Sequence, residues 1–131
     1  GGSAYIERAN REVFVAVQIE NREAFHALDA ILAIPGLDSI VLGPMDLSAA
    51  MGLFGELDHP TVAAALETII TKSRAAGRFV GSGMGADARF AATMVQRGVQ
   101  WLQVGGDCDY MILAVDQVTA AIHSRLAGKP S

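Results

Sequence analysis

Two hydrophobic patterns alternate along this chain. Four short, almost continuously apolar runs predict strands, and they comprise residues 13–20, 39–42, 78–81 and 101–104. Such runs, bounded by turn residues, are typical of strands that are buried on both faces. Between and after them, apolar residues recur every three or four positions and predict helices, which comprise residues 22–33, 61–76, 88–97 and 109–127. A short helical turn is expected over residues 47–51.

Capping and turn residues support these boundaries. Asn21 and Asp87 precede two of the predicted helices and are suited to cap them, because their side chains accept hydrogen bonds from free N–H groups. Asp58 or Thr61 could cap the helix that covers residues 61–76. Gly77 follows that helix, where a positive φ is favoured.

The order of elements predicts an α/β fold with a parallel βαβαβαβα unit. Alternating strands and helices require a parallel sheet with right-handed crossovers. A complete (β/α)8 barrel takes ~250 residues, so 131 residues correspond to about half of one. Two strand edges then stay open, and a second copy, an N-terminal half or helices must cover them. Residues 1–12 are expected to be an expression remnant and lead-in, and residues 13–131 the half-barrel.

Composition limits the classes of partner. Hydrophobic residues make up 51% of the chain and the mean hydropathy is +0.33, which suits a doubly covered sheet or a large interface. The net charge is −4 and no basic run is present, which argues against nucleic acid. No apolar stretch reaches the ~18 residues of a membrane span. The single cysteine, Cys108, cannot form an internal disulfide, so a reducing cytoplasm is expected.

Two carboxylates follow successive predicted strands. Glu20 ends the first strand, and Asp46 lies just past the second, after Gly43-Pro44. The carboxyl ends of parallel strands lie at one edge of a sheet, so the two carboxylates can share one hard cation. Alternatively, they cap nearby helices or are simply solvated. Glu23 and Asp38 are nearby acids, but a first-turn position and a turn position explain them.

Two glycine-rich turns are weaker candidates. The segment 81–85 (GSGMG) precedes a helix and resembles a phosphate-binding loop, but it lacks the P-loop lysine, which favours a tight turn. The segment 105–107 (GGD) follows the last strand, where barrels often bind phosphate. Trp101 is expected in the core between strand and helix. The helix over residues 109–127 is apolar on several stripes, mostly for core packing and partly for a subunit contact.

Four ordered motifs resemble one family. They are VQIENREA at 17–24, IPGLD at 34–38, GPMDLS at 43–48 and HPTV at 59–62. Together they are similar to the HpcH/HpaI aldolases, which are class II, metal-dependent pyruvate aldolases with a (β/α)8 barrel. The resemblance covers strands five to eight of that barrel.

The resemblance implies a role for each matching residue. Glu20 and Asp46 fall on the metal ligands of the family, for Mg, Mn or Co. The metal would polarise a 2-oxo acid such as pyruvate, which adds to or is released from an aldehyde. The substrate-binding segment would be residues 43–46, with backbone N–H groups around Gly43, Met45 and Asp46 facing the substrate carboxylate. Pro44 itself has no N–H to donate.

The same resemblance implies that the site is incomplete. The family's catalytic His and its carboxylate-binding Arg belong to the N-terminal half of the barrel. His26, His59 and His123 lie at positions that do not replace the missing histidine. The chain alone is therefore expected to be inactive, and the family implies homo-oligomers.

Two other functions stay open at this stage. The chain could be a non-catalytic half-barrel that self-associates or pairs with a complementary fragment. It could also be a flavodoxin-like or phosphate-binding α/β domain, although four strands are few for that fold and strand-end acids suit a cation better than a phosphate.

Overall fold

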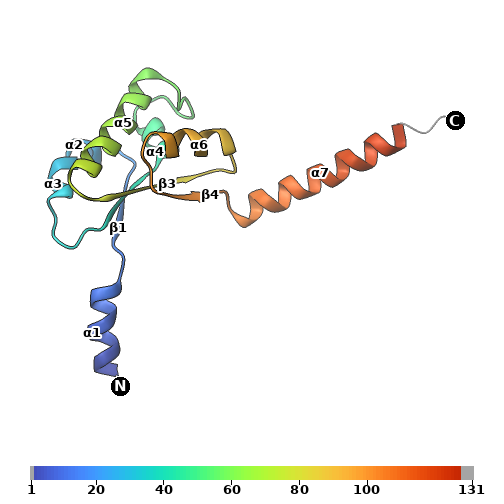
Figure 1. The fold of residues 1–131 in the computed structure, drawn as a ribbon. Coiled ribbons are helices and arrows are strands. Elements are labelled where there is room, and N and C mark those ends of the chain that lie inside the picture. The colour runs from blue at the N-terminus through green and yellow to red at the C-terminus, as the bar shows by residue number, and fades with distance from the viewer. Residues whose placement is uncertain (1, 128–131) are drawn as a thin grey trace.

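The computed structural model describes residues 2–127 and contains one parallel four-stranded sheet. The strands lie in the order β1-β2-β3-β4, so each neighbours the next one along the chain (Figure 1). Their bounds are Ala16–Ile19 for β1, Ser39–Leu42 for β2, Phe79–Met84 for β3 and Trp101–Val104 for β4. The predicted βαβαβαβα order is confirmed, and β2 and β4 have the predicted bounds.

Five helices pack beside the sheet, and two extend away from it (Figure 1). The packed helices are α2 Arg22–His26, α3 Leu28–Leu32, α4 Pro44–Ala50, α5 Pro60–Ala75 and α6 Ala88–Gln96. The extended helices are α1 Gly2–Glu12 and α7 Asp107–Ala127. No helix within residues 2–127 is both long and apolar enough to cross a membrane.

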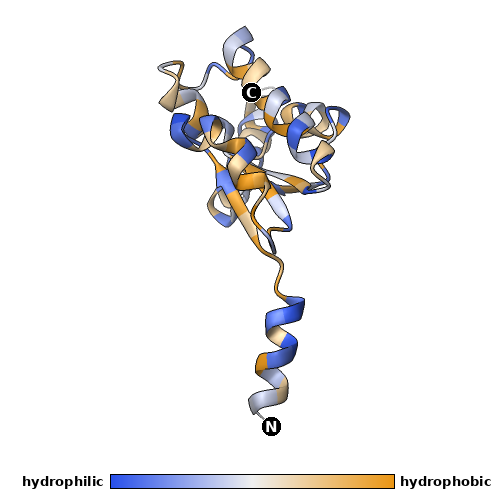
Figure 2. Cartoon of the chain, turned by 90° about the vertical axis from the view of Figure 1, so that its left-hand side faces the viewer, coloured by the Kyte–Doolittle hydropathy of each residue, from blue (hydrophilic) through white to orange (hydrophobic). Residues whose placement is uncertain are grey.

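The core lies between the sheet and its helices. Ile40, Leu42 and Val80 are fully buried on that face of the sheet, and α5 contributes Leu66 and Ile69. The strands are predominantly hydrophobic, whereas α1 is mostly hydrophilic (Figure 2). Burying each such side chain contributes roughly 1.5–3 kcal/mol, so this single layer of contacts holds the sheet and helices together.

The opposite face of the sheet is open and carries Trp101, whose expected place between strand and helix is therefore wrong. In register across the four strands lie Gln18, Val41, Gly81 and Trp101, so their side chains share one face. The indole lies over Gly81, where an added Cβ would be 2.1 Å from Trp101 Cε2. Its Nε1 donates a hydrogen bond to Ser39 Oγ at 3.1 Å. Trp101 thus needs a glycine beneath it.

The first strand is shorter than predicted. Strand pairing starts at Ala16, and Val13, Phe14 and Val15 are 59%, 54% and 40% exposed. Val15 N–H donates to Asp38 Oδ2 at 2.8 Å instead of to a strand. The apolar run was expected to be covered on both faces, but β1 is an edge strand, and nothing within residues 2–127 covers the face opposite the core.

Three further boundaries differ from the predictions. Strand β3 runs on to Met84, so most of segment 81–85 is strand and forms no phosphate-binding loop. The predicted helix 22–33 is interrupted at Ala27, where ψ is 6°. His59 caps α5 in place of Asp58 or Thr61, because its side chain accepts from Thr61 N–H. Asn21 and Asp87 cap α2 and α6 as predicted, and Gly77 has a φ of +72°.

Helix α7 contradicts its predicted role in the core. It begins at Asp107, earlier than expected, and none of its residues is buried. Eight of its large apolar side chains are 44–64% exposed, namely Tyr110, Met111, Ile112, Leu113, Val115, Val118, Ile122 and Leu126. The sequence spacing correctly indicates apolar stripes, but their partner surface is absent from residues 2–127.

Candidate active site

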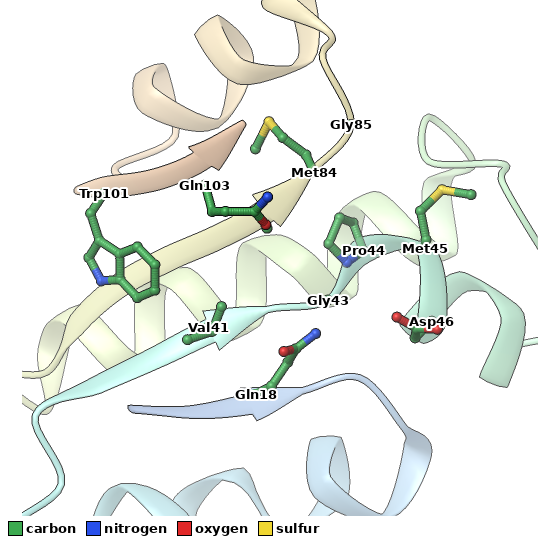
Figure 3. A pocket seen from close by; sticks show the side chains of 11 residues that line it. Gln18, Val41, Gly43, Pro44, Met45, Asp46, Met84, Gly85, Trp101 and Gln103 are labelled. Carbon is green, nitrogen blue, oxygen red and sulfur yellow. The ribbon is translucent and has the colours of Figure 1, made fainter. Parts of the chain in front are cut away.

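A cavity of about 490 Å³ opens at the carboxyl ends of the strands. Figure 3 shows its lining side chains, which come from all four strands and from the start of α4. The lining residues are Gln18, Val41, Gly43, Pro44, Met45, Asp46, Gly83, Met84, Gly85, Trp101 and Gln103. Parallel α/β folds bind their ligands at this end of the sheet, so the cavity is the candidate active site.

Glu20 is not a lining residue of this cavity, but it lies against Gly43, which is one. It directly follows β1 and is half-buried. A Cβ added to Gly43 would lie 2.8 Å from Glu20 Cβ, 3.1 Å from Glu20 Oε2 and 2.7 Å from Gln18 Nε2. Gly43 therefore leaves the space that Glu20 and Gln18 occupy. Its own N–H donates to Ile19 O at 3.3 Å and joins the two strand ends.

Asp46 lies in the first turn of α4 and lines the cavity. The helical turn was expected to begin at Leu47, but α4 starts at Pro44, whose fixed φ suits the first position of a helix. Leu47 N–H donates to Gly43 O at 2.8 Å, so the N–H groups of Met45 and Asp46 precede the first intrahelical bond. The N-cap residue, Gly43, has no side chain, so no side-chain cap occupies these N–H groups. Two backbone donors are thus available at the cavity.

The charge of the site is acidic. Asp46 lines the cavity, Glu20 lies beside it, and no Lys, Arg or His is among the lining residues. Within residues 2–127 no group of three or more His, Cys, Asp and Glu side chains could hold a metal ion. Two carboxylates with substrate and water oxygens still form a suitable set of hard donors for Mg²⁺, which commonly keeps several waters.

The other ionisable candidates lie elsewhere. His26 is in α2, His59 caps α5, and His123 is in α7, so no histidine of this chain lines the cavity. Asp38 accepts the Val15 N–H, and Glu23 is in the first turn of α2. Glu23 thus has the first-turn position predicted for it, whereas Asp38 bonds to the segment before β1 and not within its own turn.

Two glutamines in the cavity were missed by the sequence reasoning. Gln18 and Gln103 point into the cavity from the strands at the two edges of the sheet (Figure 3). Gln103 Nε2 donates to Gly105 O, which leaves Gln103 Oε1 as a free acceptor beside Gly83. The sequence did contain a signal for them. Each is a polar residue in an otherwise apolar strand, and the alternation of side chains along a strand places it on one defined face of the sheet.

Residues 3–114 match the HpcH/HpaI aldolase/citrate lyase family. The chain belongs to this family. Among HpcH/HpaI proteins, it is 37% identical over 126 residues to the 4-hydroxy-2-oxo-heptane-1,7-dioate aldolase of Salmonella newport, covering 95% of this chain and 48% of that one. It is also 37% identical over 114 residues to the hydroxypyruvate/pyruvate aldolase of Pseudomonas aeruginosa, covering 87% of this chain and 42% of that enzyme.

A solved structure of the family has the same architecture as this chain over about half of its length. The HpcH/HpaI aldolase from Desulfitobacterium hafniense DCB-2 superposes with a TM-score of 0.77 at 30% identity, covering 100% of this chain and 49% of that one. This chain therefore spans about half the length of the HpcH/HpaI relatives it matches. The four-stranded sheet therefore matches about half of an HpcH/HpaI TIM barrel, so the flavodoxin-like alternative is wrong.

Proposed function

We propose that this chain supplies the metal-binding half of a pyruvate aldolase, a carbon–carbon lyase that joins or separates a 2-oxo acid and an aldehyde. The observation on which the proposal rests is the junction at Gly43, where Glu20 and the first turn of α4 come together at the cavity. The family match and the names of the two aldolase relatives support the same chemistry.

Glu20 and Asp46 would hold the cation, which we propose to be Mg, Mn or Co. Both provide carboxylate oxygens at the ends of neighbouring strands, and neither is engaged in an ion pair among residues 2–127. The bound cation would act as a Lewis acid toward the keto oxygen of the 2-oxo acid.

The start of α4 would bind the carboxylate of the 2-oxo acid. Met45 and Asp46 offer backbone N–H donors there, and Pro44 holds the first turn in place without competing for the substrate. Gly43 adds no donor, contrary to the expectation from the sequence, because its own N–H is bonded to Ile19 O. Because backbone donors are fixed by the fold, they orient the substrate at little entropic cost.

The proton-transfer group is not supplied by this chain. No histidine lines the cavity. We therefore propose that the other half of the barrel provides the base and a further cation, and that this chain alone binds ligands without turnover. Homo-oligomers would be expected for the whole enzyme.

Pyruvate binding tests the proposal. We expect the 131-residue chain to bind pyruvate in the presence of Mg²⁺ and to lose most of that affinity when EDTA removes the metal. Line broadening of the pyruvate methyl signal in NMR spectra reports binding without requiring turnover. Equal broadening with and without EDTA would show that the carboxylate pair does not act through a metal.

The open sheet favours a second candidate, a half-barrel that pairs with another copy. Phe14 lies near Phe79 in a tilted arrangement and near Trp101 edge-on, with ring centroids 6.1 and 6.5 Å away, and both phenylalanines are about half exposed. Parallel sheets are normally covered on both faces. Sedimentation should then give a dimer of twice 13.7 kDa that Phe79→Glu converts to monomer. A monomer of the unaltered chain at all concentrations would exclude this candidate.

A further inference from the structure

Strand β4 places two large side chains over glycines of β3. In the parallel register, Gly81 pairs with Trp101 and Gly83 pairs with Gln103. A Cβ added to Gly83 would lie 3.1 Å from Gln103 Oε1, so the amide oxygen of Gln103 lies against the backbone of Gly83. Both residues line the candidate active site, and Figure 3 shows the Gln103 side chain pointing into it. Gly83 thus provides the space for a polar group inside the cavity.

One hydrogen bond determines which end of this amide faces the cavity. Gln103 Nε2 donates to Gly105 O. A carbonyl oxygen only accepts, so an amide rotated by half a turn would bring two acceptors together. The NH2 group of Gln103 therefore faces Gly105, and Oε1 is the atom that Gln103 presents over Gly83.

The carbonyl that anchors Gln103 is itself held in place. Gly105 is buried, has a φ of +64°, and donates its N–H to Met84 O at 2.8 Å. The hydroxyl of Tyr110 donates to Val104 O at 2.6 Å, which bonds the preceding residue as well. Because its anchor is fixed, Gln103 Oε1 is a preoriented acceptor and binds a ligand with little loss of side-chain entropy.

The chemistry of the proposed substrates limits what this acceptor can bind. Carboxylate, keto and aldehyde oxygens only accept hydrogen bonds, and a methyl group does not donate one. Among the oxygen groups of such acids and aldehydes, only a hydroxyl donates. A hydroxylated ligand therefore gains a hydrogen bond at Gln103 that its unsubstituted counterpart lacks. The net gain is modest, because water is the alternative partner of the acceptor.

We infer that Gln103 is a substrate-binding residue that accepts a hydrogen bond from a hydroxyl group of a hydroxylated 2-oxo acid. This inference rests on the proposed aldolase function, because it specifies the substrate class of that same site. The hydroxyl can have two sources. It lies on carbon 3 when the 2-oxo acid that enters the reaction is itself hydroxylated. It lies on carbon 4 in the aldol adduct, in which the former aldehyde oxygen has taken up a proton.

Two pairs of 2-oxo acids test the inference and distinguish the two sources. Hydroxypyruvate and pyruvate differ by a hydroxyl on carbon 3, and 4-hydroxy-2-oxobutanoate and 2-oxobutanoate differ by a hydroxyl on carbon 4. Each acid is titrated with Mg²⁺ into the ¹⁵N-labelled 131-residue chain, and the side-chain amide signals of its glutamines are recorded. The Gln103 signal is identified by its absence from the spectrum of Gln103→Met.

In the unaltered chain, we expect at least one hydroxylated acid to shift the Gln103 signal and to bind about fivefold more tightly than its unsubstituted partner. Gln103→Met keeps the length of the side chain but removes the acceptor, so it should reduce this affinity ratio to about one. Gln117→Met makes the same replacement at an exposed position of α7 and should leave the ratio unchanged. The pair of acids that shows the preference identifies the carbon that carries the hydroxyl.

A second variant displaces the acceptor without removing it. The Cβ of Gly83→Ala would be 3.1 Å from Gln103 Oε1, so the flexible glutamine must shift. If Gln103→Met does not fold, Gly83→Ala replaces it and should lower the affinity ratio at least about twofold.

Two results would overturn the inference. They are equal affinities within both pairs for the unaltered chain, and an unchanged affinity ratio in the folded variant. Repeating the titrations with EDTA separates this inference from the proposed function. If pyruvate binds only with Mg²⁺ but a hydroxyl brings no preference, the Gln103 inference fails alone. If the Gln103-dependent preference is equally strong with EDTA, the metal-dependent aldolase function fails instead.

Discussion

Replacing Glu20 with Gln is expected to weaken Mn²⁺ binding to this chain by about 100-fold or more. Loss of an outer-shell partner typically costs 10- to 100-fold in metal affinity, and Glu20 is proposed as a direct ligand. The amide keeps the size of the side chain beside Gly43 but removes its charge, so the change isolates the electrostatic contribution. Titration calorimetry with Mn²⁺ measures the effect.

Glu23→Gln is the matched control for this prediction. Glu23 lies three residues further on, in the first turn of α2, and, unlike Glu20, is not one of the side chains nearest to Gly43. The Glu23→Gln change removes one negative charge close to Glu20, as Glu20→Gln does. It should change the Mn²⁺ affinity less than about threefold, because solvent and salt screen a charge at the surface. Equal losses in the two variants would mean that general negative charge, not Glu20, attracts the metal.

Replacing Gly81 with Ala is expected to lower the free energy of unfolding by about 3 kcal/mol. The added Cβ would lie 2.1–2.5 Å from Cε2, Cζ2 and Cδ2 of the Trp101 indole, a large rigid group held by its bond to Ser39. Trp101 cannot move aside without losing that bond and its position in the cavity. Urea denaturation of the two proteins gives the difference.

The chain offers a control and a rescue for Gly81→Ala. Gly85→Ala places its Cβ in open space at a φ that is not positive, so it should change stability by less than about 0.5 kcal/mol. Adding Trp101→Leu to Gly81→Ala should recover part of the loss, because the clashing atoms are removed. Similar stability of Gly81→Ala and Gly85→Ala would show that the indole is not fixed over Gly81.

How far the sequence predicts this fold depends on what each element packs against. Strand β2 was predicted with its observed bounds because it is buried at the centre of the sheet and ends at Gly43-Pro44. Helix α7 was predicted as a helix, but its contacts were not, because apolar spacing does not say which chain covers the stripe. The predicted third strand ends at residue 81, before the observed end of β3, because Gly81 and Gly83 are typical turn residues. In the structure, Gly81 instead makes room for Trp101.

The sequence predicts those parts of the candidate site whose position depends only on where the strands end. Glu20 and Asp46 follow two adjacent parallel strands, so the sequence already placed both at one edge of the sheet. What the sequence did not indicate is the close approach at Gly43, since it depends on how β1 and β2 pair.

Whether Glu20 and Asp46 share a metal ion is tested by the paramagnetic broadening that a bound Mn²⁺ causes in the backbone amide signals of the ¹⁵N-labelled chain. We expect substoichiometric Mn²⁺ to broaden first the amide signals of residues 19–21, 43 and 45–47, around the two proposed ligands; Pro44 has no N–H and gives no signal. Selective broadening elsewhere, such as around Asp107 and Asp109 at the start of α7, with the amide signals of residues 19–21, 43 and 45–47 unaffected, would contradict a metal site between Glu20 and Asp46.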